Sequence, residues 1–88
     1  MKNFIMYFTA QWCGPCKQTR PIIERLNKES ESPRFLIIDA DEAPQMMKDF
    51  GINGVPTFIF IKNEEEVRRE TGSRTEANLL EFIDYIEQ

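Results

Sequence analysis

The residues best suited to chemistry in this sequence are two cysteines, Cys13 and Cys16, in a segment that reads WCGPCK. The segment lies where an apolar, strand-like run changes to a helical pattern. Backbone N–H groups at the start of a helix carry partial positive charge, which would favour a thiolate at Cys13. Because the thiolate and not the thiol attacks a disulfide, a cysteine at this position is expected to react at neutral pH.

The spacing of the two cysteines predicts how they work together. Two intervening residues bring Cys16 round one helical turn, close enough to Cys13 to form a disulfide. We therefore expect a redox-active pair in which Cys13 attacks a substrate disulfide and Cys16, the more buried thiol, resolves the mixed disulfide. A purely structural disulfide is the alternative interpretation.

The composition excludes other kinds of site. The chain has no histidine, so no imidazole base is present for a Ser–His or Cys–His pair. A structural zinc site takes four ligands, usually Cys and His, which two cysteines alone do not supply. We expect no metal and no cofactor beyond the redox-active disulfide Cys13–Cys16.

The length and charge of the chain limit the classes of partner that it is expected to bind. The 88 residues include 15 acidic and 11 basic side chains, a formal net charge of −4. This balance argues against nucleic acid, which needs a basic footprint, and against anionic lipid. No apolar run approaches the ~20 residues of a membrane span, and the first residues do not resemble a secretory signal. We expect one domain, residues 1–88, in the cytoplasm.

Apolar patterning predicts four strands and three helices in the order β-α-β-α-β-β-α. Continuous apolar runs predict buried strands, and apolar stripes at helical spacing predict helices. The expected strands are residues 4–8, 35–39, 57–61 and 66–71. The expected helices run from Gly14-Pro15 to about residue 28, from about 43 to 50, and from about 75 to 86.

Local signals and connection rules then predict the fold class. Ser73 and Glu76 fit a capping box at the start of the last helix. Gly51 would end the middle helix in a left-handed conformation. A strand–helix–strand start implies a parallel pair of strands with a right-handed crossover. The expected fold is α/β, a four-stranded mixed sheet flanked by three helices.

Two segments carry a resemblance to a known family. Residues 9–17 closely resemble the active-site stretch of thioredoxins, and Val55-Pro56-Thr57 is similar to the family's second hallmark. The resemblance covers the chain from residue 4 onward and implies a thioredoxin-like fold that lacks the family's N-terminal strand and helix. It also implies a cis peptide bond before Pro56 and pairing of the Val55 backbone with a bound substrate chain.

The resemblance implies roles for four further residues. Gly14 and Pro15 form the reducing version of the family's motif, and with Trp12 they would tune the cysteine pair. Trp12 would also shield the cysteines and contact partners, and Gly72 matches a glycine beside the rim of the family's active site.

Two positions depart from the family. Tyr7 stands where thioredoxins commonly have a buried aspartate that helps take a proton from the buried cysteine. Ile37 stands where they have a lysine. A phenol with a pKa near ~10 is a poor base at neutral pH, so Tyr7 is interpreted mainly as a packing residue. We hypothesise that water or Asp39 serves as the proton relay for Cys16.

The function implied is that of a monomeric protein-disulfide reductase. Thioredoxin reductase or an equivalent donor would recharge it, and ribonucleotide reductase would be one substrate. Two alternatives stay open. A glutaredoxin-like enzyme coupled to glutathione fits the small size, although glutaredoxins commonly carry Pro-Tyr between the cysteines. A non-catalytic module that binds a partner through Trp12, Val55 and Pro56 would need no redox chemistry.

Overall fold

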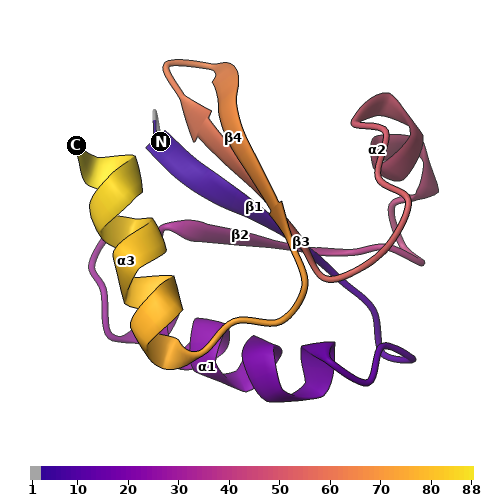
Figure 1. Cartoon of the computed structure of the whole chain (residues 1–88), viewed down its shortest axis with the longest axis horizontal. Coiled ribbons are helices and arrows are strands. Elements are labelled where there is room, and N and C mark those ends of the chain that lie inside the picture. The colour runs from indigo at the N-terminus through magenta and orange to yellow at the C-terminus, as the bar shows by residue number, and fades with distance from the viewer. Residues whose placement is uncertain (1–2) are drawn as a thin grey trace.

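Four strands form the centre of the computed structural model, which describes residues 3–88 (Figure 1). The strands are β1 (Asn3–Thr9), β2 (Phe35–Asp39), β3 (Thr57–Lys62) and β4 (Glu65–Thr71), and the helices are α1 (Cys16–Lys28), α2 (Pro44–Asp49) and α3 (Glu76–Glu87). The strands lie in the order β2-β1-β3-β4. β1 is parallel to β2 and antiparallel to β3, which is antiparallel to β4. The predicted order and mixed sheet are confirmed, with element ends within two residues of the predicted ones.

The helices cover the two faces of this sheet unequally. α1 and α3 lie against one face, and α2 lies on the other (Figure 1). On the first face, Ile23 of α1 and Phe82 of α3 belong to one buried cluster with Tyr7 of β1. Neighbouring residues of a strand point to opposite faces, and Phe8 accordingly packs on the other side with Met47 of α2. The sheet therefore separates two apolar cores.

The prediction that residues 35–39 form a buried strand is wrong for part of β2. This strand lies at the edge of the sheet and pairs only with β1. Its Ile38 is buried, but its Leu36 is 44% exposed. Both side chains lie on the face that α2 covers, and a helix of six residues covers Ile38 without reaching Leu36.

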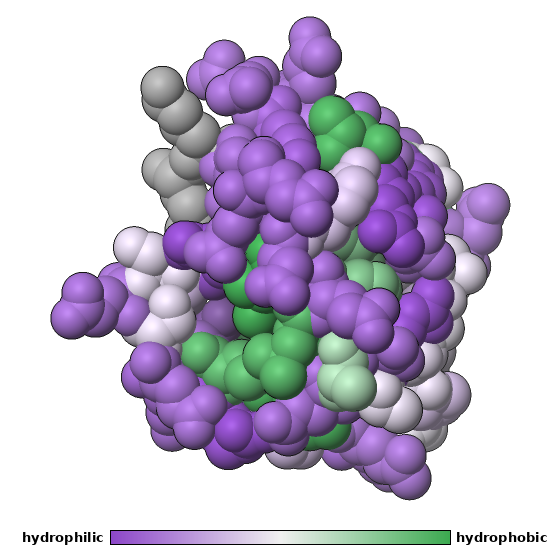
Figure 2. Space-filling model, turned by 60° about the vertical axis from the view of Figure 1, so that its left-hand side comes forward, coloured by the Kyte–Doolittle hydropathy of each residue, from purple (hydrophilic) through white to green (hydrophobic). Residues whose placement is uncertain are grey.

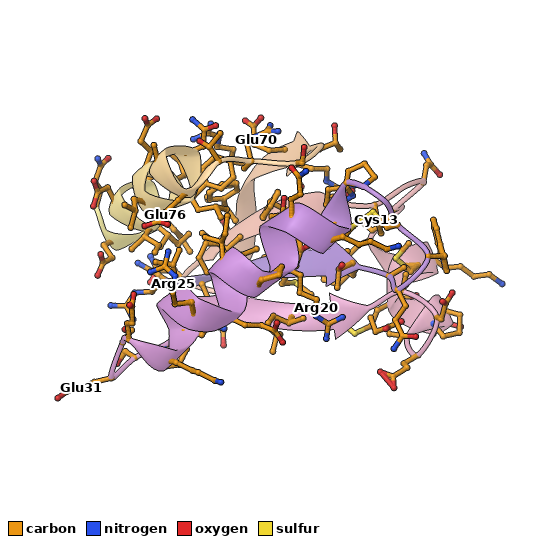
Figure 3. The ribbon with its side chains drawn as sticks, turned by 90° about the horizontal axis from the view of Figure 1, so that it is seen from below. Cys13, Arg20, Arg25, Glu31, Glu70 and Glu76 are labelled. Carbon is orange, nitrogen blue, oxygen red and sulfur yellow. A yellow bond between two sulfur atoms is a disulfide. The ribbon has the colours of Figure 1, made fainter. Side chains whose placement is uncertain are left out.

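The capping box predicted at Ser73 is also wrong, because Thr75 is the N-cap of α3. The Thr75 hydroxyl accepts a hydrogen bond from the Asn78 backbone N–H at 3.2 Å. An N-cap oxygen reaches only the N–H groups of the turn that follows it, so the cap depends on where the helix begins. Glu76 forms an ion pair with Arg25 of α1, which joins the two helices on this face (Figure 3).

Left-handed backbone shapes two of the connections. Gly51 has φ +64° and follows α2, as predicted. Asn63 and Glu64, between β3 and β4, have φ of 52° and 70°. Two residues with positive φ form the hairpin turn whose twist matches that of the strands.

Hydrophilic side chains cover most of the face that Figure 2 shows. Figure 2 shows one face, on which they surround a small group of hydrophobic side chains in a hollow. None of the helices in residues 3–88 is long and apolar enough to cross a membrane.

Candidate active site

Cys13 and Cys16 form a disulfide where the chain passes from β1 into α1. α1 begins at Cys16, with Pro15 as its N-cap, and the Cα atoms of the two cysteines lie 5.3 Å apart. Cys13 is 3% exposed and Cys16 is 2% exposed, so the greater burial expected of Cys16 is marginal in this disulfide form. The pair packs with Ala10 and Ala40 in a small apolar cluster.

The N-terminal end of α1 points at the sulfur of Cys13. The Cys16 backbone N–H donates a hydrogen bond to Cys13 Sγ at 3.2 Å. Pro15 supplies no side-chain cap, and the first turn of α1, which the structure describes in full, contains no acidic residue. Gly14 closes the turn, since its carbonyl accepts the Lys17 N–H at 3.1 Å. With no carboxylate at this helix end, its positive charge acts on the sulfur.

The segment Val55-Pro56 lies beside the cysteines. Its peptide bond is cis, as the resemblance implied. The Val55 carbonyl oxygen lies 3.7 Å from Cys13 Sγ, so the backbone before Pro56 borders the sulfur that an incoming disulfide would meet. Cys13 and Val55 are 42 positions apart in the sequence, and the sheet brings them together because β1 and β3 are neighbours.

A groove of about 330 Å³ continues from this segment, lined by residues 51–57 with Arg69, Thr71 and Gly72. The Gly72 N–H donates a hydrogen bond to the Pro56 carbonyl at 2.9 Å. Gly72 has φ +93°, a conformation that glycine adopts without strain. The chain at Gly72 therefore passes close to Pro56.

Trp12 stands on the surface next to the disulfide. Its side chain is 67% exposed. The indole Nε1–H donates a hydrogen bond to Asp41 Oδ2 at 2.9 Å. Asp39 lies at the end of β2, and its carboxylate accepts the Asp41 backbone N–H at 2.8 Å. Sequence reasoning did not identify Asp41 as the anchor of the ring, since its carboxylate comes from a segment 29 residues away.

Tyr7 is fully buried and stacks on Phe58, with 5.1 Å between the ring centroids. Burial is the main cause of a pKa above the ordinary value of 10.0, which a nearby Thr9 hydroxyl partly opposes. The Tyr7 hydroxyl has no hydrogen-bond partner among the described residues. Ile37, in place of the family's lysine, is partly buried against the same core.

Within residues 3–88, no group of three or more His, Cys, Asp or Glu side chains could hold a metal ion.

The thioredoxin family model matches residues 1–85. The chain belongs to the thioredoxin family. It is 37% identical over 76 residues to the thioredoxin of Chlamydia muridarum, covering 86% of this chain and 74% of that protein. Against the thioredoxin of Rickettsia typhi the identity is 35% over 81 residues, which are 91% of this chain and 77% of that one. The X-ray structure of Fasciola hepatica thioredoxin matches with a TM-score of 0.84 and 35% identity, over 97% of this chain and 81% of that one.

Membership of the thioredoxin family accounts for the cysteine pair. This chain is a thiol–disulfide oxidoreductase of the disulfide-reductase type, which works by dithiol exchange. The family in general acts on disulfide substrates and receives electrons from a reductase. The fold prediction is confirmed by the same comparisons.

Proposed function

We propose that Cys13 is the nucleophile and Cys16 the resolving thiol of a protein-disulfide reductase. The Cys13 thiolate attacks one sulfur of a substrate disulfide, and the other substrate sulfur leaves as a thiolate that takes a proton from solvent. Cys16 then loses its proton and attacks Cys13 Sγ. This step forms the Cys13–Cys16 disulfide and releases the second substrate sulfur as a thiolate, which is protonated in turn.

One observation carries this division of roles. The N–H at the start of α1 donates its hydrogen bond to Cys13 Sγ. A donor at a helix N-terminus stabilises a thiolate, and the thiolate is the attacking species. Cys16 is within the first turn of the helix and cannot receive this stabilisation in the same way.

We propose that the substrate is an extended protein segment lying along Val55 and Pro56. The Val55 carbonyl is 3.7 Å from Cys13 Sγ, so a chain pairing with this backbone as an added strand would carry its disulfide to the nucleophile. Trp12 and Gly72 form the two sides of this surface: the ring is exposed, and the glycine is hydrogen-bonded to Pro56.

The proposed function also includes an electron donor and a cellular compartment. Thioredoxin reductase is the proposed donor, with ribonucleotide reductase as one substrate. A reducing cytoplasm fits this work because its thiol systems maintain dithiols in the reduced state. The chain would act as a monomer with residues 1–88 as one domain.

Trapping experiments test the roles of the two cysteines. The Cys16→Ser variant should accumulate a covalent mixed disulfide with a disulfide-containing protein such as insulin, because nothing resolves it. The Cys13→Ser variant should form none. Stable adducts with Cys13→Ser, or none with Cys16→Ser, would reverse or refute the assignment.

The source of electrons is tested separately with the unaltered protein. Turnover of insulin should be faster with NADPH and thioredoxin reductase than with glutathione and glutathione reductase. The equilibrium potential of the pair should lie near about −270 mV, against roughly −200 mV for a glutathione-coupled enzyme. Preferential turnover with glutathione would favour the glutaredoxin-like alternative.

A further inference from the structure

A pocket of about 230 Å³ opens beside Cys16, on the face of the sheet that α1 covers. Its lining combines Cys16 and Thr9 with three charged residues of α1, Lys17, Arg20 and Glu24. Figure 3 shows α1 with Cys13 at its N-terminal end and Arg20 farther along the helix. The pocket thus connects the buried residue Cys16 with a charged stretch of the surface of α1.

Two buried hydroxyl groups lie on the strand that reaches this pocket, and one of them belongs to Thr9, which lines it. Tyr7 and Thr9 are two residues apart on β1, so their side chains lie on the same face of the sheet. Both residues are 0% exposed, and neither hydroxyl oxygen has a hydrogen-bond partner within residues 3–88. An unpartnered buried hydroxyl is unfavourable, and proteins commonly satisfy such groups with ordered water.

The charged groups around Cys16 leave few candidates for its proton. Tyr7 keeps its own proton at neutral pH, because burial raises its pKa. Asp39 and Asp41 flank Ala40, but their carboxylates bond the Asp41 N–H and the Trp12 indole.

Other neighbours of the pair, such as Met47 and Val55, are apolar. Lys17 and Arg20, which also line the pocket, have basic side chains. Among the residues that line the pocket, Glu24 is the single carboxylate.

We propose that this pocket is the proton exit of Cys16, with Thr9 as the positioning residue that holds water against the Cys16 thiol. The inference rests on the proposed function, in which Cys16 attacks Cys13. As the Cys16–Cys13 bond forms and the Cys13–substrate bond breaks, the electron pair leaves on the substrate sulfur, which takes a proton from solvent. The Cys16 proton passes to the water and leaves between Arg20 and Glu24.

The chemistry of a threonine suits this role. Its hydroxyl both donates and accepts a hydrogen bond, and rotation about χ1 moves it between staggered positions. In the disulfide form the Thr9 hydroxyl is buried near Tyr7. Turned toward the pocket, it can hold a water molecule beside the sulfur that reduction has freed. The Arg20–Glu24 ion pair, 3.8 Å between Nε and Oε2, forms the mouth.

The test separates the two chemical steps with 5,5′-dithiobis(2-nitrobenzoate), a small disulfide that releases one coloured thiolate at each step. The first release reports attack by Cys13, and the second, concentration-independent release reports resolution by Cys16. Both rates are measured by rapid mixing from about pH 5 to about pH 9. Thr9→Val removes the hydroxyl at similar volume, and Thr9→Ser keeps it. Glu24→Gln removes the carboxylate, and Glu29→Gln, at the C-cap of α1, is its matched control.

Thr9→Val should slow the second release about tenfold at neutral pH and move its pH midpoint upward, while the first release keeps its rate. Thr9→Ser should restore the second release, and Glu24→Gln should slow it about threefold. Glu29→Gln should change neither. An unchanged second release in Thr9→Val, or equal slowing of both releases, would overturn the proposal. Failure of the proposed function would look different, because the unaltered protein would then not show two sequential releases.

Discussion

At the scale of single residues, two backbone groups set the environment of Cys13 Sγ. The Cys16 N–H lies 3.2 Å from the sulfur and the Val55 carbonyl oxygen lies 3.7 Å from it. The N–H favours a thiolate and the carbonyl accepts a thiol proton, so the nearer group supports the reactive form. The reactivity proposed for Cys13 therefore depends on where α1 begins, and not on a neighbouring basic side chain.

Trp12 offers a direct probe of this rim because it is the single tryptophan of the chain. Asp41→Ala removes the acceptor of the indole N–H, so the ring should move more freely. We expect lower fluorescence anisotropy and about fivefold weaker substrate binding, which corresponds to about 1 kcal/mol for one hydrogen bond. Asp49→Ala, which removes a carboxylate bonded to Gln45 in α2, is the control. An unchanged anisotropy in Asp41→Ala would contradict the anchoring.

At the scale of elements, the residue that caps a helix depends on the exact position at which the helix begins. Ser73 and Thr75 are both hydroxyl residues shortly before α3, and either could have capped it by type. The structure selects Thr75, which has extended backbone and a side chain that reaches the Asn78 N–H. Gly72, directly before Ser73, has a left-handed backbone conformation, and α3 begins only after Thr75.

Because Thr75 caps α3 and Ser73 does not, substitutions at the two positions form a matched pair. Thr75→Ala should lower the free energy of unfolding by about 1 kcal/mol, because the first turn of α3 loses its side-chain acceptor. Ser73→Ala should change it by less than about 0.5 kcal/mol. Urea unfolding followed by circular dichroism measures both. A larger effect of Ser73→Ala than of Thr75→Ala would show that Ser73 is the cap, as the sequence suggested.

The strand β4 carries an ion-pair network that should make stability depend on pH. The pKa of Glu70 lies below its ordinary value of 4.5, chiefly because Arg68 donates a hydrogen bond to it. Arg74 adds a second contact, 3.1 Å from the carboxylate. A carboxyl group whose folded pKa is lowered contributes stability above its unfolded pKa, and this contribution is lost as the pH falls through the folded value.

Glu70→Gln should therefore destabilise the protein at neutral pH by less than about 1 kcal/mol, as is usual for partly exposed ion pairs. The difference from the unaltered protein should shrink below about pH 4.5 and vanish in stronger acid. Glu65→Gln, on the same strand, is the control. Thermal unfolding from neutral to acid pH measures both, and a difference that persisted in acid would rule out the ionic explanation.

At the scale of the whole molecule, one sheet must support two apolar cores within 88 residues. Two helices, α1 and α3, cover one face, whereas the short α2 covers only part of the other (Figure 1). A domain of this size has a free energy of unfolding of only about 5–10 kcal/mol. The central strands therefore carry most of the packing, and the edge strand β2 carries less.

Two substitutions that shorten a side chain to alanine compare the centre of the sheet with its edge. Ile59→Ala, at a side chain that is fully buried in β3, should cost about 2–5 kcal/mol. Leu36→Ala, at a side chain that is 44% exposed in β2, should cost less than about 1 kcal/mol. Urea midpoints measure the two. Should Ile59→Ala not fold, Ile59→Val replaces it, with an expected cost of about 0.5–1.5 kcal/mol. An equal loss of unfolding free energy at the two positions would contradict the conclusion that the central strands carry most of the packing.

The fold was predictable because its signals are local. Continuous apolar runs mark β1 and β3, which are buried on both faces, and helical stripes mark α1 and α3. The same reasoning failed for β2, where an apolar run lies at an edge. An apolar run reports a preference for burial, but whether a neighbouring element covers it depends on the length and position of that element.

The sequence by itself determined the chemistry and the order of elements: the two cysteines, their spacing at the start of a helix, and the Val55-Pro56 pair. These depend on residues adjacent in the chain. Only the tertiary structure decided that Asp41 holds Trp12, that Val55 borders Cys13, and that Thr9 and Glu24 line one pocket with Cys16. Such contacts join segments distant in sequence, and their geometry follows from how the sheet and its helices pack.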